Sequence, residues 1–184
     1  MHFPIFYFLY TIISMELPHH WRKEKILTLE EAAKKSAELR AQGKTIVSHN
    51  GSYDLLHGGH LDMLEEAKQQ GDILIVGINT DVSIRDAKGP TRPIIGVENR
   101  AAMLAALICV DYVTVMDGAY NEEPQGSFIP AIKPHIHVNG EEYGPEEKWI
   151  EYGAMQACGA KGYSVGRRPN LSTSDIIKKI QSEV

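Results

Sequence analysis

The sequence predicts an α/β protein whose five strands form a single Rossmann-like, doubly wound parallel sheet with helices on both faces. Short apolar runs alternate with amphipathic helical patterns from residue 28 to residue 183, which is typical of right-handed βαβ units. The run Asp72–Asn79 (DILIVGIN) is apolar between its turn residues, as expected for a strand buried on both faces. A glycine-bearing turn joins the first strand to its helix, and such turns hold anions.

Composition and charge narrow the class of protein. The chain has 184 residues, of which 43% are apolar and 23% charged, and its formal net charge is −5. These values fit one soluble globular domain and disfavour a general nucleic-acid binder. Cys109 and Cys158 lack the spacing of a metal or disulfide framework, which favours a reducing, cytoplasmic compartment.

The first residues differ from the rest of the chain. They are aromatic and apolar but shorter than the roughly 20 residues of a membrane-spanning helix. We expect residues 1–15 to be an extension outside the fold, with a membrane or partner anchor as the alternative. Residues 16–184 are then the domain, and we expect no association with a membrane.

The expected elements follow the alternation in order. A helix spans residues 28–42, because Thr28 and Glu31 form a capping-box pattern and Gly43 supplies the stop. The first strand, over residues 44–48, leads through SHNGSYDLLHGGH into a helix over residues 59–70. After the strand at 72–79 we expect a helical turn over 81–87, the basic loop KGPTRP and a helix over 98–108. A strand over 111–116 follows, then a turn-rich segment over 117–126 and a short helix over 127–132. The last expected elements are a strand over 134–138, a helix over 145–158, a strand over 162–165 and a helix over 172–183.

Four loops at the carboxyl ends of these strands carry groups that suit a polyphosphate. Ligands of a doubly wound sheet bind at that edge, where the strand order reverses, and helix N-termini there offer N–H groups and a positive dipole. Neither GxGxxG after the first strand nor a P-loop is present. The candidates are His57 and His60, then Lys88 and Arg92, then Asn139, Glu141 and Glu142, and finally Arg167, Arg168, Ser172, Thr173 and Ser174.

Several stretches resemble the nucleotidyltransferase superfamily defined by an HxGH motif. They are NGSYDLLHGGH, GDILIVGINTD, AKGPTRP, ENRAAMLAAL and LSTSDIIKKI. Within that superfamily the sequence is similar to the branch that holds glycerol-3-phosphate cytidylyltransferase and the adenylyltransferase domain of the bifunctional heptose-phosphate enzyme. AKGPTRP and LSTSDIIKKI look more like the latter.

The resemblance implies a role for particular residues. It implies that His57 and His60 bind the triphosphate and stabilise charge at the α-phosphorus, and that Lys88 and Arg167 assist as phosphate-binding cations. The remaining nucleotide contacts that it implies are Asn50, Gly51, Ser52, Tyr53, Gly59, Arg100, Asn139, Gly140, Glu142, Ser172, Thr173 and Ser174. Substrate contacts are expected at Asp54, Arg92, His137 and Tyr143.

The implied reaction moves a nucleoside monophosphate from a nucleoside triphosphate to a phosphorylated sugar or alcohol. ATP is favoured over CTP, and the favoured acceptor is D-glycero-D-manno-heptose 1-phosphate, which would yield ADP-heptose. Mg²⁺ would arrive with the triphosphate, and the protein itself is expected to hold no metal. The resemblance also implies a homodimer.

Other interpretations stay open on the sequence alone. Within the enzyme class, the alternative is a cytidylyltransferase for glycerol 3-phosphate or another phosphorylated alcohol, because Asn139 stands where the adenylyltransferase has lysine. From another class, the chain could be a nucleotide-sensing module. His57 and His60 could be a metal pair, His137 could only pack, Asp54 could brace its loop, and Ser172–Ser174 could only cap a helix.

Overall fold

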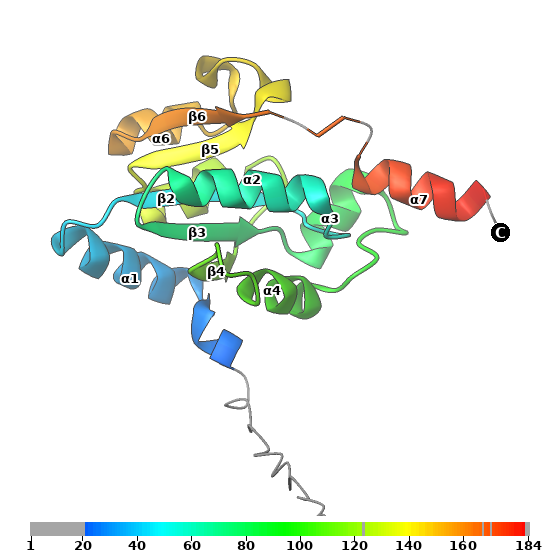
Figure 1. Ribbon diagram of the computed structural model, residues 1–184, viewed down its shortest axis with the longest axis horizontal. Helices are drawn as coiled ribbons and strands as arrows, with labels where there is room; N and C mark the ends of the chain where they lie inside the picture. The colour runs from blue at the N-terminus through cyan, green and yellow to red at the C-terminus, as the bar shows by residue number, and fades with distance from the viewer. Residues whose placement is uncertain (1–20, 123, 167, 170, 183–184) are drawn as a thin grey trace, which may run out of the picture.

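A six-stranded, all-parallel β-sheet forms the centre of the computed structural model (Figure 1). The structure describes residues 21–122, 124–166, 168–169 and 171–182, so the predicted extension over residues 1–15 lies outside it, as does Arg167. The strands lie in the order β1-β4-β3-β2-β5-β6. Their bounds are Ile26–Leu27 (β1), Ile46–Gly51 (β2), Ile73–Ile78 (β3), Tyr112–Val115 (β4), Ile136–Gly140 (β5) and Lys161–Val165 (β6).

β2 is the strand from which the sheet extends in both directions. β3 pairs with one edge of β2 from Ile46 to Gly51, and β4 and β1 continue that side. β5 pairs with the other edge at Val47 and Ser48, and β6 lies beyond it. The strand order therefore reverses beside β2, and the carboxyl ends of β2 and β5 border the crevice in which such sheets bind ligands.

Helices cover both faces of this sheet. Their bounds are Leu29–Ala41 (α1), Gly58–Gln69 (α2), Asp81–Lys88 (α3), Val97–Ala105 (α4), Ile129–Ile132 (α5), Tyr152–Cys158 (α6) and Thr173–Ser182 (α7). Short 3-10 helices span Trp21–Lys25, Glu141–Tyr143 and Glu146–Lys148, and a π-helical turn spans Pro124–Phe128. Among the helices of the described residues, none is long and apolar enough to cross a membrane.

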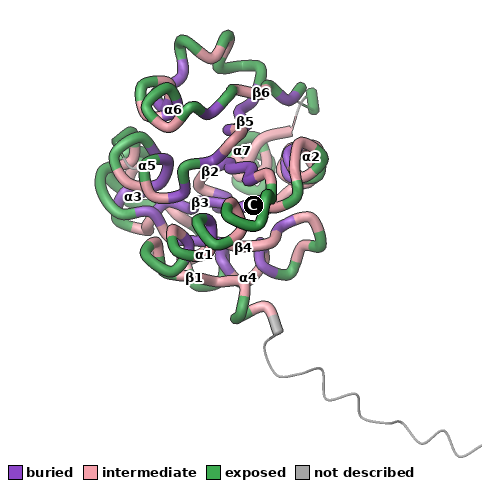
Figure 2. The backbone as a smooth tube through the Cα atoms, turned by 90° about the vertical axis from the view of Figure 1, so that its left-hand side faces the viewer, coloured by how far each residue is buried: buried purple, intermediate pink, exposed green. Residues whose placement is uncertain are grey.

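Alternating side chains on the strands divide the core into two apolar clusters. Val47 packs in one cluster with Leu64 of α2 and Leu104 of α4. Ile46 and Ile75 belong to the other, with residues of α1, α5 and α6. Neighbouring strand residues point to opposite faces, so both faces of the sheet are covered, as the apolar runs predicted. Figure 2 shows this burial along the central strands, with exposed backbone outside.

The predicted parallel, doubly wound architecture is confirmed; several element bounds shift by a few residues, and two differences are larger. β1 adds a sixth strand of two residues, too short to leave a sequence pattern; next to it, Lys25 donates to the carbonyls of Leu107 at 3.2 Å and Val110 at 2.7 Å. The continuous helix predicted over residues 145–158 is wrong. The backbone of Trp149 is extended (ψ 143°), because its buried indole packs inward and donates to the Gly144 carbonyl at 2.9 Å.

Candidate active site

The loop between β2 and α2 brings two histidines together at a helix N-terminus. His57 is the N-cap of α2, and its backbone N–H donates to His60 Nδ1 at 3.4 Å. The two imidazoles stack, with ring centroids 3.8 Å apart and planes 20° apart. Gly59 permits this stacking, because a Cβ there would lie 3.3 Å from the His57 ring. The first helical turn thus presents two rings beside its backbone N–H groups.

The surroundings of His60 favour its neutral form. Burial, followed by the charges of His57, His49 and Lys88, lowers the pKa of His60 to about 3. Because Nδ1 accepts the backbone hydrogen bond, the proton of the neutral ring is on Nε2. A bound polyphosphate would favour the charged ring, since a nearby opposite charge raises the pKa of histidine.

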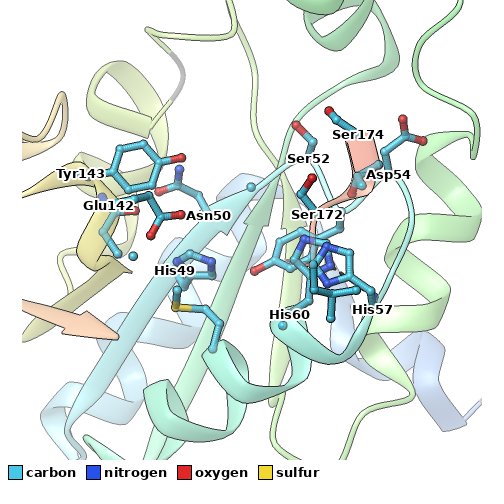
Figure 3. Close-up of a pocket in the computed structure, with 18 of the residues that line it drawn as sticks. His49, Asn50, Ser52, Asp54, His57, His60, Glu142, Tyr143, Ser172 and Ser174 are labelled. Atoms are coloured by element: carbon cyan, nitrogen blue, oxygen red, sulfur yellow. Dashed lines mark hydrogen bonds between the residues drawn. The ribbon is translucent and has the colours of Figure 1, made fainter. Parts of the chain in front are cut away.

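These rings line a cleft of about 420 Å³ at the carboxyl ends of β2 and β5 (Figure 3). Most of the predicted site residues meet in it. Those that line it are Asn50, Gly51, Ser52, Tyr53, Asp54, His57, Gly59, His60, Lys88, Arg92, Asn139, Gly140, Glu142, Tyr143, Ser172, Thr173 and Ser174. The fold therefore assembles, in one place, groups that the sequence spreads over more than a hundred positions.

A lysine reaches into this cleft from the end of α3. Lys88 Nζ donates to Ser52 Oγ at 3.0 Å and lies 5.1 Å from the centre of the Tyr120 ring. The Tyr120 hydroxyl in turn lies 3.0 Å from Ser52 Oγ. An ammonium group and two hydroxyls are thus held next to the histidine turn, and each can donate to phosphate oxygen.

Asp54 braces the basic loop. Its side chain is 1% exposed, accepts from the backbone N–H groups of Ile94 at 2.6 Å and Ile95 at 3.0 Å, and forms an ion pair with Arg92. These bonds fix the loop that follows Lys88 against the β2–α2 loop. The bracing interpretation of Asp54 is the one that its hydrogen bonds favour, although both partners of the ion pair line the cleft.

Arg100 and His137 do not line the cleft. Arg100 is fully buried, and its guanidinium donates to the carbonyls of Ser52 at 2.6 Å and Asn79 at 2.7 Å and pairs with Asp81 at 2.7 Å. His137 is also fully buried on β5, with Nδ1 2.8 Å from Ser48 Oγ. Neither side chain is exposed to the cleft in this structure: Arg100 holds the loop, and His137 packs against Ser48. Their contacts with nucleotide and substrate stay predictions.

The start of α7 closes another side of the cleft. Ser172 Oγ accepts from the backbone N–H of Asp175 at 3.1 Å and so caps the helix, and Thr173 Oγ1 is 3.4 Å from the Leu55 carbonyl. Arg168 forms a bidentate ion pair with Asp62 of α2, in which Nε donates to Oδ2 at 2.6 Å and Nη2 donates to Oδ1 at 2.7 Å. Capping and phosphate binding use the same N-terminal geometry, so the cap does not remove these hydroxyls from consideration.

Sequence reasoning missed part of the lining. The missed residues are His49, Met63, Tyr120, Gly166 and Leu171. His49 left a weak signal, since it lies at the end of the first strand beside the motif; its Nδ1 is 2.8 Å from the Val138 carbonyl, and burial lowers its pKa. Tyr120 left none, because it lies in a turn-rich segment that only the tertiary fold brings to Ser52.

Comparisons with known proteins identify the family of the chain. The cytidylyltransferase-like family model matches residues 49–179. The protein from Syntrophotalea carbinolica named bifunctional protein HldE is 37% identical over 88% of this chain and 32% of its own length. Its namesake from Geobacter sulfurreducens is 38% identical over 91% of this chain and 33% of its own length. The chain thus spans about a third of the length of these curated relatives.

Two solved structures are also similar. A lipopolysaccharide core biosynthesis protein from Thermoplasma volcanium has 25% identity and a TM-score of 0.56, covering 68% of this chain and 98% of that one. A pantoate-beta-alanine ligase from Francisella tularensis, complexed with an ATP ligand and beta-alanine, has 17% identity and a TM-score of 0.51, over 86% of this chain and 78% of that one, and so shares the fold alone. The family match spans most of the domain and contains the histidine turn, the basic loop and the start of α7, so the chain belongs to the cytidylyltransferase-like family of nucleotidyltransferases.

Proposed function

We propose that the protein transfers the adenylyl group of ATP to a phosphorylated sugar, most specifically D-glycero-D-manno-heptose 1-phosphate, and releases pyrophosphate in the cytoplasm. The observation that carries the proposal is the stacked pair His57 and His60 at the N-terminus of α2, in a cleft that also holds Lys88 and the hydroxyls at the start of α7. Helix N-termini, imidazole N–H groups and a lysine are complementary to a triphosphate.

In the proposed reaction an oxygen of the acceptor phosphate attacks the α-phosphorus of ATP. The new P–O bond forms as the bond to the bridging α,β oxygen breaks, and pyrophosphate leaves in line with the attack. The acceptor phosphate is already ionised near neutral pH, so no strong base is needed. His57, His60 and Lys88 donate hydrogen bonds to the oxygens that gain charge, and positioned donors of this kind are worth about 2.7–4 kcal/mol each.

In this proposal Mg²⁺ binds together with the nucleoside triphosphate. Among the described residues, no group of three or more His, Cys, Asp or Glu side chains is arranged to hold an ion. The two imidazoles stack face to face at 3.8 Å instead of converging on a point between their nitrogens. Mg²⁺ would therefore take most of its ligands from triphosphate oxygens and water, as it commonly does at nucleotide sites.

The preference for a heptose acceptor rests on similarity. The relatives named bifunctional protein HldE support it, as do the stretches AKGPTRP and LSTSDIIKKI. The chain matches only a third of those relatives, so their whole activity does not transfer with the match. By the same analogy we propose a homodimer, which light scattering would detect as about twice the 20.5 kDa of one chain.

A substrate panel tests the proposal. Pyrophosphate release would be measured for ATP, CTP, GTP and UTP against heptose 1-phosphate, mannose 1-phosphate and glycerol 3-phosphate. We expect turnover with ATP and heptose 1-phosphate to exceed every other pair. Turnover with CTP and glycerol 3-phosphate instead would make the protein a cytidylyltransferase, and tight nucleotide binding with no turnover would favour a sensor.

A further inference from the structure

A second, smaller cleft of about 200 Å³ adjoins the main one. Asn50, Tyr120 and Tyr143 line both clefts, so the two spaces meet at these side chains. The second cleft continues on the α5 and α6 side, where Trp149 and Glu151 line it. Its volume is about seven times the roughly 30 Å³ that one water molecule occupies in the liquid.

A buried carboxylate lines this second cleft. Glu151 is 3% exposed, and its two oxygens accept from the side-chain amides of Asn50 at 3.4 Å and Asn139 at 3.3 Å. An ionised carboxylate accepts about four hydrogen bonds, so these two leave capacity for a ligand. His137 Nε2 lies 4.0 Å away, beyond hydrogen-bond distance, and burial lowers the pKa of His137 to about 3, so it supplies no positive charge.

Glu151 and Asn50 give this site free acceptor capacity, and Lys148, which also lines the second cleft, adds a cationic donor. Asn50 Oδ1 is buried and, within the part of the chain that the structure describes, has no hydrogen-bond partner. Buried polar atoms are costly when unpaired. Glu151 and Asn50 together therefore favour a ligand rich in donors. Burial raises the pKa of Glu151, and an ionised Glu151 would repel a second anionic group, so a set of hydroxyls suits these acceptors better than a carboxylate or phosphate does.

The second cleft also lies on the side from which an acceptor must approach. Figure 3 shows Asn50 and Tyr143 across the main cleft from His57 and Ser172. If pyrophosphate leaves toward α7, an in-line attack comes from the opposite side. Tyr120 lines both clefts, and its hydroxyl and Lys88 both contact Ser52 Oγ. The Tyr120 hydroxyl can therefore donate to an acceptor phosphate at the junction, with the rest of the acceptor extending into the second cleft.

We propose that the second cleft binds the neutral, polyhydroxylated carbon skeleton of the acceptor, and that Glu151 is a specificity-determining residue that accepts hydrogen bonds from its hydroxyls. This inference rests on the proposed function, since it assumes that nucleotide phosphates occupy the histidine side of the main cleft. It goes beyond that function because it makes one carboxylate responsible for selecting acceptors by their length and number of hydroxyls.

The test compares Glu151→Gln with Glu147→Gln. Both changes remove one carboxylate charge without altering size, but Glu147 is exposed and lines neither cleft. Binding of heptose 1-phosphate, mannose 1-phosphate and glycerol 3-phosphate would be measured by calorimetry with a non-hydrolysable ATP analogue present. Steady-state KM values for acceptor and ATP would be measured alongside.

We expect Glu151→Gln to weaken heptose 1-phosphate binding about 10- to 100-fold, the range for a lost hydrogen bond to a charged group. The affinity of Glu151→Gln for ATP should stay within about twofold of wild type, and its affinity for glycerol 3-phosphate should fall less than that for heptose 1-phosphate. Glu147→Gln should change none of these affinities. Asn121→Trp is a second variant, because Asn121 is exposed at the rim of the cleft, where a bulky side chain would block the acceptor without touching the core.

The outcomes separate this inference from the proposed function. Weaker acceptor binding in both variants, with ATP unaffected, supports the inference even if turnover is absent. An unchanged acceptor affinity in both variants overturns it, as does a wild-type protein that binds no sugar phosphate. A rise in the KM for ATP in place of the acceptor would mean that the base occupies the second cleft, which also overturns it. If the protein turns over its substrates and Glu151→Gln has no effect, the proposed function holds and this inference fails.

Discussion

Replacement of Arg100 by methionine tests whether a buried guanidinium holds the phosphate-binding loop. Met replaces the aliphatic stem of the side chain but removes the guanidinium, and with it every donor to the carbonyls of Ser52, Asn79 and Ile95 and the charge opposite Asp81. Each buried acceptor left unsatisfied costs about 1–3 kcal/mol, and loss of one partner of a buried ion pair costs about 3–5 kcal/mol. Asp81 is partly exposed and can rehydrate, so the three carbonyls dominate the loss, and we expect a total of about 3–5 kcal/mol, toward the lower end of their summed cost.

Urea unfolding measures this loss directly. With a slope of about 2 kcal/mol per molar urea, the midpoint should fall by about 1.5–2.5 M. The control is Arg85→Met on the exposed side of α3, which should change stability by less than about 0.5 kcal/mol. A loss below about 1 kcal/mol for Arg100→Met, or equal losses for both variants, would refute the idea that Arg100 braces the loop from inside.

Further predictions concern the histidines and the first helix. His57→Ala and His60→Ala should each lower turnover by about 100-fold or more with the fold intact, as for a lost oxyanion donor; near-normal turnover in rapid pyrophosphate assays would remove that ring from the mechanism. Because burial lowers the pKa of His137 to about 3, the unfolded chain binds more protons between about pH 6.5 and 3, and stability should fall as the pH falls through that window. His137→Asn should flatten the slope by up to about 1.4 kcal/mol per pH unit, and an unchanged slope in urea titrations would count against a buried neutral ring. Thr28→Ala should lose about 1 kcal/mol, because Thr28 and Glu31 form a reciprocal cap; no loss on thermal unfolding would show that the cap contributes nothing.

The sequence predicted those elements whose ends are determined by neighbouring residues, such as capping boxes and glycines. The capping box of Thr28 and Glu31 is present where its pattern predicts it. Gly71 ends the helix after the motif and leaves no room for a side chain, since a Cβ there would lie 2.7 Å from Val47. Trp149 shows the limit of such reasoning. Its neighbours favour a continuous helix, but burial of the indole beside β6 breaks it, and burial is a tertiary property.

In the candidate site, too, residues close in the sequence could be predicted, whereas residues that only the tertiary fold brings together could not. His57, Gly59 and His60 lie in one turn, so their spacing in the sequence already determines that they meet. The burial of Arg100 was not predicted, because the sequence does not reveal which face of a helix its side chain takes, and here it points into the protein. Tyr120 and Glu151 were not predicted as site residues, since each reaches a cleft only through the pairing of distant strands and the placement of their loops.

A crystal structure with a non-hydrolysable ATP analogue and Mg²⁺ tests the central claim most directly. We expect the α- and β-phosphates at the N-terminus of α2, with oxygens within hydrogen-bond distance of His57 and His60 and with Lys88 moved from Ser52 onto phosphate. A triphosphate bound elsewhere, or at this helix with both imidazoles turned away from it, would contradict the account.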